Sequence, residues 1–165
     1  MNLSLCDMVM SRPPIKLITL ALGLALTAAA LGGCSSNTPT LKDGYYSAEA
    51  AAFDSQGWKE YISIYVNEDK IVTAEYNAKN ASGFLRSWDM DNMRRINAET
   101  GVYPNKYARA YTEALLNRQN PAHINAMPGA GRALKSFQLL AEAAIARARG
   151  GDKTVAVVEL PDEDQ

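Results

Sequence analysis

Alternating apolar and polar residues predict a β-hairpin in the middle of the chain. Residues 58–66 place Trp58, Ile62, Ile64 and Val66 on one face, which is the period-two pattern of a half-buried strand. A turn at residues 67–69 follows, and residues 70–76 return as a second run rich in β-branched side chains. Residues 45–53 have weaker strand character and end in the turn cluster 54–57.

Apolar residues spaced three and four apart predict three helices after the hairpin. The first spans residues 89–100, with Asp89 or Ser87 as cap and Gly101 as stop. The second begins at Pro104 and ends before residue 121. The third ends at residues 150–151 and carries a buried stripe of Ala133, Leu134, Phe137, Leu140, Ala141, Ala144, Ile145 and Ala148.

The order of these elements predicts the fold class. Residues 153–160 alternate loosely and add a final edge strand, which gives the order β-β-β-α-α-α-β. Runs of strands followed by runs of helices are typical of α+β domains. We therefore expect an α+β fold in which about three helices pack on a small antiparallel sheet.

The N-terminus has the pattern of an export signal. An apolar run from Leu17 to Gly33 follows Arg12 and Lys16, and small residues precede Cys34. The sequence Leu31-Gly32-Gly33-Cys34 resembles the lipobox of bacterial lipoproteins. The resemblance implies that Cys34 is acylated, as with palmitate, and becomes the first residue of the mature protein.

An uncleaved membrane anchor is the alternative. The apolar run of 17 residues is shorter than the roughly 20 that a membrane-spanning helix needs, and its second half is only weakly apolar. We expect a signal peptide at residues 1–33, a tether at 34–41, one domain at 42–160 and an acidic tail at 161–165.

Composition narrows the function classes. Residues 35–165 carry 15 Lys and Arg against 17 Asp and Glu, so no basic excess argues for nucleic acid. Cys6 leaves with the signal peptide and Cys34 takes the lipid, so the domain has no disulfide and no cysteine ligand. With His123 as the only histidine, a zinc site of His/Cys type is excluded.

A glycine-rich loop is the first candidate for chemistry. The run Pro128-Gly129-Ala130-Gly131-Arg132 stands directly before the last helix. Glycines let the backbone approach a ligand, and the unpaired N–H groups and dipole of a helix N-terminus attract phosphate. The alternative is a plain helix entry with solvated cations.

Several motifs in order resemble the FMN-binding domain family of bacterial envelope lipoproteins, which includes flavin-carrying subunits of sodium-pumping NADH:quinone reductase and of the Rnf complex. The resemblance covers about residues 42–150. The motifs include Lys42-Asp43-Gly44-Tyr45-Tyr46, Lys70-Ile71-Val72, Asn80-x-x-Gly83, Arg86-Ser87, Asn120-Pro121 and Gly129-Ala130.

This chain departs from the motif through which that family attaches flavin. The family pattern is Ser-Gly-Ala-Thr, whose threonine is esterified to FMN phosphate in many members. Gly129 and Ala130 match it, but Pro128 stands at the serine and Gly131 at the threonine. Glycine has no oxygen to esterify, so the resemblance leaves either non-covalent FMN, with Arg132 pairing its phosphate, or a relative that has lost flavin.

The loop from Asn80 to Trp88 is the second candidate for a wall of the binding site. The resemblance places Arg86 and Ser87 where the family has a basic-serine pair, so Arg86 can face an anion while Trp88 or Phe84 covers the flavin ring. The alternative is that both aromatic residues are core side chains and that Arg86 lies on the surface or caps a helix.

These observations predict a lipid-anchored, extracytoplasmic protein that binds FMN without a covalent bond and relays electrons to a redox partner protein. The cofactor-binding residues would be Arg86, Ser87, Gly129, Ala130, Gly131 and Arg132. The alternative is a flavin-free structural or interaction lipoprotein. No nucleophile–base pair, carboxylate dyad or metal cluster is visible, so we expect no metal and no intrinsic enzyme. Ser35 lacks the aspartate of inner-membrane retention, which favours the outer membrane in a two-membrane cell.

Overall fold

The computed structural model describes residues 40–161. The predicted signal peptide at residues 1–33, the lipid site at Cys34, most of the tether and residues 162–165 of the acidic tail lie outside this range. The described chain forms a four-stranded sheet with three α-helices and two short 3-10 helices, which confirms the α+β class.

Three long strands follow one another as an antiparallel meander. They are β1 (Gly44–Ala50), β2 (Lys59–Asn67) and β3 (Lys70–Lys79), and β4 (Ala156–Val158) joins at the other edge to give the order β3-β2-β1-β4. Pairing of Ile62 with both Ala48 and Tyr76 sets the register that turns the apolar alternation of all three strands to one face.

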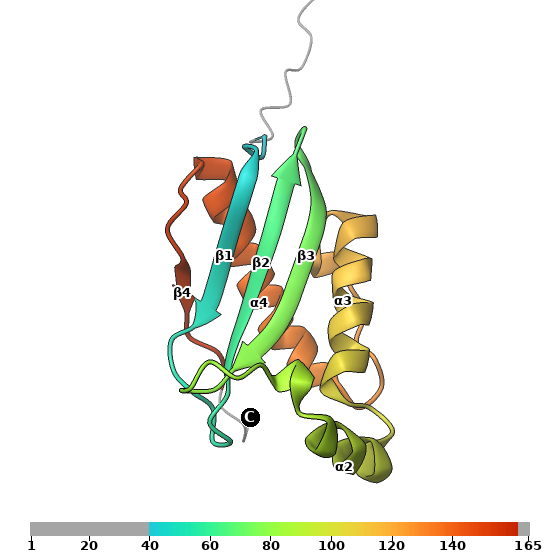
Figure 1. Ribbon diagram of the computed structural model, residues 1–165. Helices are drawn as coiled ribbons and strands as arrows, with labels where there is room; N and C mark the ends of the chain where they lie inside the picture. Colours follow the sequence, from blue (N-terminus) through green and yellow to red (C-terminus); the bar gives the residue numbers. More distant parts are fainter. Residues whose placement is uncertain (1–39, 162–165) are drawn as a thin grey trace, which may run out of the picture. The chain divides into compact units, whose positions relative to one another are not determined.

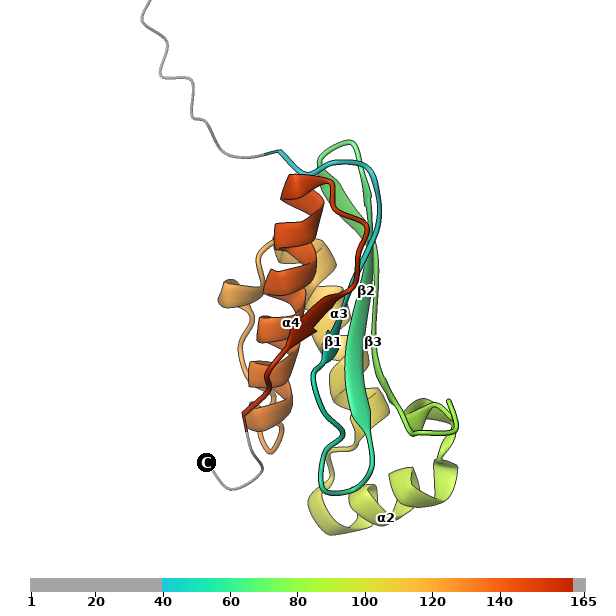
Figure 2. The same ribbon diagram turned by 90° about the vertical axis from the view of Figure 1, so that its left-hand side faces the viewer.

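The helices follow the meander. They are α2 (Met90–Thr100), α3 (Pro104–Arg118) and α4 (Gly131–Gly150), with η2 (Arg86–Trp88) and η3 (Pro121–His123) in the connections. In Figure 1 α4 runs behind β1 and β2 while α3 lies beside β3. Figure 2 shows α3 and α4 on one side of the sheet and α2 beyond the ends of the strands.

The core lies between the sheet and α4. Ile62, Ile64 and Val66 of β2 are fully buried, and they face an α4 stripe of Phe137, Leu140, Ala141, Ala144 and Ala148 that is equally buried. Phe137 meets the rings of Tyr76 and Tyr111 at centroid distances of 5.2 and 5.6 Å. Edge-to-face and tilted aromatic contacts of this kind add to the free energy gained by burial.

Helix ends formed where the sequence predicts them. The side chain of Asp89 accepts a hydrogen bond from the backbone N–H of Asn92 and caps α2, and Gly101 ends that helix at φ 70°. Pro104 is the first residue of α3, and Gly151 ends α4 at φ 72°. The left-handed conformation at both C-terminal caps explains the glycines.

The structure corrects five details. The sheet is mixed rather than antiparallel, because β4 pairs parallel with β1 along Ala48–Ala50. The final strand has three residues rather than eight, and β1 ends at Ala50 rather than residue 53. The strand β3 continues to Lys79, because it stays paired with β2 as far as Lys59. Gly131 and Arg132 belong to α4 rather than to the preceding loop.

One side chain completes the start of β3 from outside the sheet. The amide of Gln119 accepts a hydrogen bond from the N–H of Ile71 at 2.7 Å and donates one to its carbonyl oxygen at 2.9 Å. Gln119 holds a left-handed conformation, φ 55°, at the end of α3. It therefore takes the place of a neighbouring strand and ties α3 to the edge of the sheet.

We predict that Gln119→Ala lowers the free energy of unfolding by about 1–3 kcal/mol, because Ile71 loses both partners. Urea unfolding followed by circular dichroism measures this. Asn117→Ala, on the exposed surface of the same helix end, is the control and should change stability by less than about 0.5 kcal/mol. Equal effects of the two substitutions would contradict the role given to the amide.

Candidate functional site

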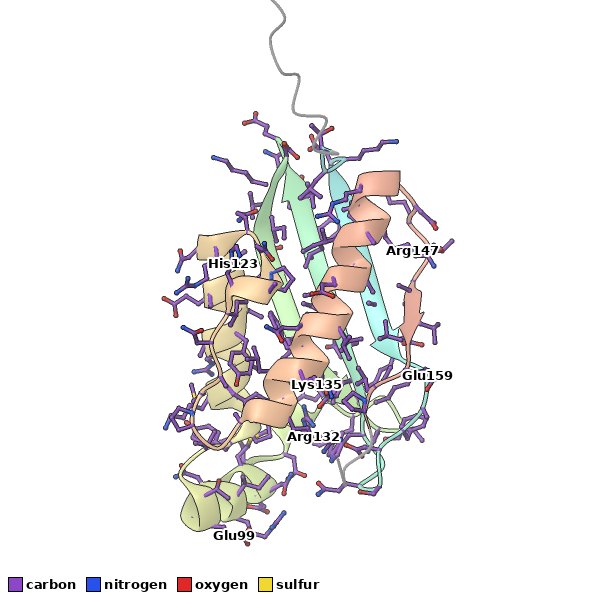
Figure 3. All side chains as sticks on the ribbon, turned by 180° about the vertical axis from the view of Figure 1, so that it is seen from behind. Glu99, His123, Arg132, Lys135, Arg147 and Glu159 are labelled. Carbon is purple, nitrogen blue, oxygen red and sulfur yellow. The ribbon has the colours of Figure 1, made fainter. Side chains whose placement is uncertain are left out.

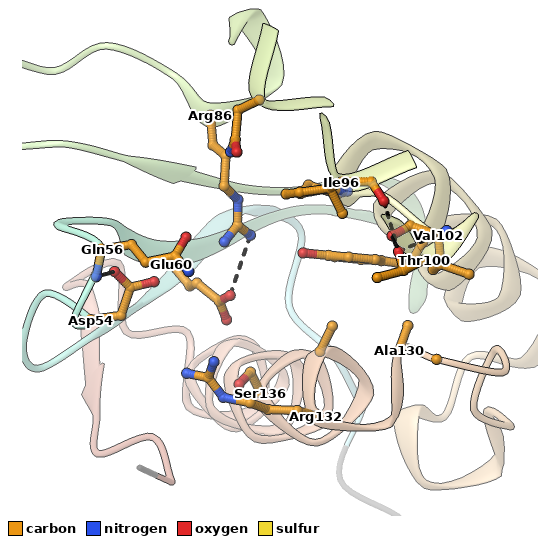
Figure 4. Close-up of a pocket in the computed structure, with 15 residues that line it drawn as sticks. Asp54, Gln56, Glu60, Arg86, Ile96, Thr100, Val102, Ala130, Arg132 and Ser136 are labelled. Atoms are coloured by element: carbon orange, nitrogen blue, oxygen red, sulfur yellow. Dashed lines mark hydrogen bonds and ion pairs between the residues drawn. The ribbon is translucent and has the colours of Figure 1, made fainter. Parts of the chain in front are cut away.

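A cavity of about 250 Å³ opens where α4 begins. Its walls come from the β1–β2 turn, β2, η2, α2, α3 and α4, so segments far apart in the sequence meet there (Figure 4). The volume lies just below the roughly 300–1,000 Å³ of pockets that enclose a drug-sized ligand. The charged and hydroxyl-bearing side chains of the lining are Asp54, Glu60, Arg86, Thr100, Tyr107, Arg132 and Ser136.

The first turn of α4 forms one wall. The first intrahelical hydrogen bond runs from the N–H of Leu134 to the carbonyl oxygen of Ala130, so the N–H groups of residues 131–133 precede the helical ladder. Ala130 is the cap residue, and its methyl side chain has no acceptor atom. The first turn, residues 131–134, contains Arg132 and no acidic residue. Such a helix end attracts anions.

Tyr111 holds the loop before α4 in place. Its buried hydroxyl donates to the carbonyl oxygen of Ala130 at 2.8 Å and accepts from the N–H of Met127 at 3.2 Å. Gly129 between them has φ 81°, a conformation that other residues rarely adopt. The backbone at the entrance of α4 is thus fixed from α3 before any ligand arrives.

A buried ion pair forms the opposite wall. A guanidinium nitrogen of Arg86, Nη2, lies 3.2 Å from Oε1 of Glu60, and both side chains are about nine-tenths buried. Figure 4 shows Arg86 reaching from η2 toward Glu60 on β2. Within residues 40–161, Nε of Arg86 is the only buried side-chain nitrogen or oxygen with no hydrogen-bond partner. A buried donor in that state needs an acceptor from a ligand or water.

Glu60 is held in turn by Tyr76. The Tyr76 hydroxyl donates to Oε2 of Glu60 at 2.8 Å and lies 3.4 Å from the carbonyl oxygen of Ala133 on α4. Burial, and then the charge of Glu60, raise the pKa of Tyr76 well above its usual range. The hydroxyl therefore stays protonated and connects the ion pair to the first turn of α4.

Tyr107 of α3 also lines the cavity. Burial raises the pKa of its phenol, and the charge of Glu60 adds to that rise while Arg86 and Arg132 oppose it. These couplings place the phenol within electrostatic reach of three charged side chains in the cavity. We therefore include it among the polar groups available to a ligand.

The structure brings together most of the residues predicted for the site. Gly129, Ala130, Arg132 and Arg86 line one cavity, and Gly131 starts the helix beside it. Figure 3 shows Arg132 and Lys135 at this end of α4 and Arg147 at the other. Ser87 lies elsewhere: its hydroxyl accepts from Asn77, and it lines a separate groove with Trp88.

The alternative interpretations of the loop after β3 were wrong, and the aromatic residues expected to cover a flavin ring, Phe84 and Trp88, do not line the cavity that contains Arg86. Arg86 is buried rather than on the surface, and its partner is Glu60. Phe84 and Trp88 are 41% and 63% exposed, so neither is a core side chain. They meet edge to face at 6.0 Å, and Phe84 also lies 6.5 Å from the ring of Trp58.

Sequence reasoning missed the polar floor of the cavity. Glu60 stands in the inward register of β2, between Trp58 and Ile62, and an acidic residue in that register was the available signal. Tyr76 and Tyr107 were not among the predicted site residues. Nothing in the local sequence marks the hydrogen bond of Tyr76 to Glu60 or the place of Tyr107 in the cavity lining, because the residues involved lie on different elements.

Two further observations concern residues 40–161. No helix in this part of the chain has the length and apolar character needed to cross a membrane. No three His, Asp or Glu side chains converge there in a way that would hold a metal ion. The single histidine, His123, lies on η3 and is not part of the cavity lining.

Comparison with known proteins gives the family. No family model matches the chain. Over 126 residues it is 32% identical to the 15 kDa lipoprotein of Treponema pallidum (strain Nichols). The matched region covers 76% of this chain and 88% of the relative. The chain belongs to the family of this 15 kDa lipoprotein. The prediction of a lipoprotein is thereby confirmed, and the chain is a lipoprotein of that family.

A solved structure supports the fold. The crystal structure of the CPE2226 protein from Clostridium perfringens matches with a TM-score of 0.70 and 31% identity, covering 74% of the lipoprotein chain and 100% of the solved chain. A solution structure from Clostridium thermocellum matches with a TM-score of 0.40 and 26% identity. The first match extends over nearly all of the described domain, so the arrangement of sheet and helices is shared.

The buried phenols predict how stability depends on pH. Folding raises the pKa of Tyr76 and Tyr107, so above pH about 10 the unfolded chain releases protons that the folded chain keeps. The contribution of these two phenols to stability is therefore complete below pH about 10 and falls as the pH rises further. Urea unfolding at pH 8, 10 and 11 measures the decline, which reaches at most about 1.4 kcal/mol per pH unit for each phenol.

Tyr107→Phe isolates one of these groups. We expect the variant to lose up to about 1 kcal/mol less than the native chain between pH 10 and 11, because it has no phenol at that position to ionise. Its stability at pH 8 serves as the internal reference. An unchanged slope above pH 10 would show that Tyr107 ionises equally in the folded and unfolded chains.

Proposed function

We propose that this lipoprotein is an extracytoplasmic, lipid-anchored protein that binds FMN without a covalent bond and exchanges electrons with a redox partner protein. The observation that carries the proposal is the uncapped start of α4 facing a buried guanidinium whose Nε–H lacks a partner. Arg86 and the first turn of α4 line the same cavity.

The residues present fit a phosphate ester. The N–H groups of residues 131–133 and the side chain of Arg132 would hold the phosphate from α4, and the guanidinium of Arg86 would face it from the opposite wall. The Gly131 position is open, since a Cβ built there meets nothing within 4 Å. The sequence from residue 128 to 134 contains no hydroxyl, so an ester to FMN at this motif is excluded.

The rest of the cofactor has room beyond the cavity. A second hollow of about 480 Å³ shares Gln56 and Asn92 with the cavity and includes Trp58 in its lining. The rest of the cofactor would lie over this second hollow. Bound flavin supplies the electron-transfer chemistry, while the protein binds and orients it.

Envelope location is the second part of the proposal. The family is one of lipoproteins, and Cys34 follows an apolar run and small residues in the manner of a lipid-attachment site. Acylation of Cys34 would tether the domain outside the cytoplasm, at the outer membrane of a two-membrane cell.

We expect Cys34→Ser to abolish palmitate incorporation and to move the chain to the soluble fraction. Unchanged labelling would exclude Cys34 as the lipid site.

A flavin-free interaction lipoprotein is the second candidate. Two observations favour it: the cavity is small, and two carboxylates, Asp54 and Glu60, share it with the two guanidiniums. A protein that has released flavin would present the same cavity to another ligand or to a protein partner. Flavin titration separates the two candidates.

We predict opposite effects of Gly131→Asp on stability and on binding. The carboxylate would occupy the anion position at the start of α4, so FMN affinity should fall roughly tenfold or more. The same carboxylate favours the helix dipole and should raise stability by about 0.5–1 kcal/mol. FMN fluorescence titration of the full chain in detergent and urea unfolding give the two measurements.

Gly131→Ala is the matched control. It replaces the same glycine in the same open space but keeps the backbone N–H and adds no charge. Its affinity for FMN should stay within about threefold of the native value. A native chain that shows no FMN binding would overturn the proposed cofactor and favour the flavin-free candidate.

A further inference from the structure

Glu60 is an unexpected residue in a cavity proposed to hold an anion. Its carboxylate lies against Arg86 on the floor of the cavity, with only 12% of its side chain exposed. A repulsive charge at that point lowers the affinity for any anion. The structure nevertheless holds it there firmly.

Two contacts prevent Glu60 from turning away. One carboxylate oxygen accepts from Arg86 and the other accepts from the hydroxyl of Tyr76. Tyr76 is 4% exposed and is wedged against Phe137. The carboxylate is thus fixed by β3 and by η2 at once, and a ligand meets it as a permanent part of the wall.

The charged groups around the cavity balance. The turn contributes Asp54, β2 contributes Glu60, η2 contributes Arg86 and α4 contributes Arg132. The residues that α2 and α3 add to the lining are uncharged at neutral pH, Tyr107 included. The formal charge of the lining is therefore zero, and the start of α4 adds about half a positive charge. This field suits one negative charge better than two.

Glu60 also limits how Arg86 can bind. Because Nη2 donates to Glu60, this carboxylate competes with a ligand for the Nε–Nη2 edge through which a guanidinium holds a phosphate by two parallel bonds. The Nε–H of Arg86 has no hydrogen-bond partner, but the Nε atom is buried. A ligand therefore meets a guanidinium whose charge is already paired with Glu60.

We propose that Glu60 is a specificity-determining residue that makes the cavity a site for phosphate monoesters in their singly charged form. The ligand class rests on the proposed function, whereas the charge selection rests on the Glu60–Arg86 pair. Without the Glu60 carboxylate, the cavity would carry a net positive charge and would favour the doubly charged ester.

The pH dependence of FMN affinity tests this. A phosphate ester loses its second proton near pH 6, so its singly charged form falls from about nine-tenths at pH 5 to about one-tenth at pH 7. We expect the FMN affinity of the full chain in detergent to fall about tenfold over that range. In Glu60→Gln the fall should disappear or reverse. Riboflavin, which lacks the phosphate, should show no such trend in either protein.

A second probe separates this inference from the proposed function. Methyl phosphate, followed through the NMR signal of the Arg86 Nε–H in the native chain, needs neither flavin nor a variant that folds. If methyl phosphate binds more weakly at pH 7 than at pH 5 and FMN does not bind, the result would support the specificity role of Glu60 and overturn FMN as the proposed cofactor. Affinity that is constant or rises over this range, for either ligand, would overturn the role of Glu60, as would a signal that methyl phosphate does not move.

Discussion

The packing of α4 against the sheet is the contact on which the rest of the domain depends. Ala141, Ala144 and Ala148 are fully buried on the helix, and their small side chains let it lie close to the equally buried Ile62 and Ile64. Because this row of small side chains packs closely against the strands, it fixes both the rotation of the helix and its position along the strands. The first turn of α4 is therefore set against the end of β2 that carries Glu60, and the cavity follows from core packing.

The elements that could be predicted from the sequence are those whose signals are local. The hairpin of β2 and β3 follows from period-two alternation, and the ends of α2 and α4 follow from Asp89, Gly101 and Gly151, whose roles need only neighbouring residues. The α+β class follows from the order of these elements.

What could not be predicted depends on contacts between distant residues. The direction of β4 depends on how the chain returns after α4, and three residues carry too little pattern to reveal a parallel pairing with β1. The amide of Gln119 completes β3 from 48 residues away. The glycine-rich loop and Arg86 were identified, but Glu60, which lies 26 residues from Arg86 in the sequence, was not. The start of α4 could be predicted because a helix end has a local sequence signal, whereas the side of the cavity formed by Glu60 has none.

The desolvation cost of the buried ion pair between Glu60 and Arg86 indicates that the pair serves binding rather than stability. Removing two charges from water offsets most of their attraction, so a buried pair is often no more stable than apolar residues of the same size. Ile62 and Ile64, the next inward residues of β2, show that apolar side chains fit this face. The unpartnered Nε of Arg86 adds a desolvation cost of about 1–3 kcal/mol. A sequence selected for stability alone would have continued the apolar face through position 60. The polar pair instead occupies the end of the strand that faces the cavity, and local conflict with the folding pattern of this kind marks binding sites.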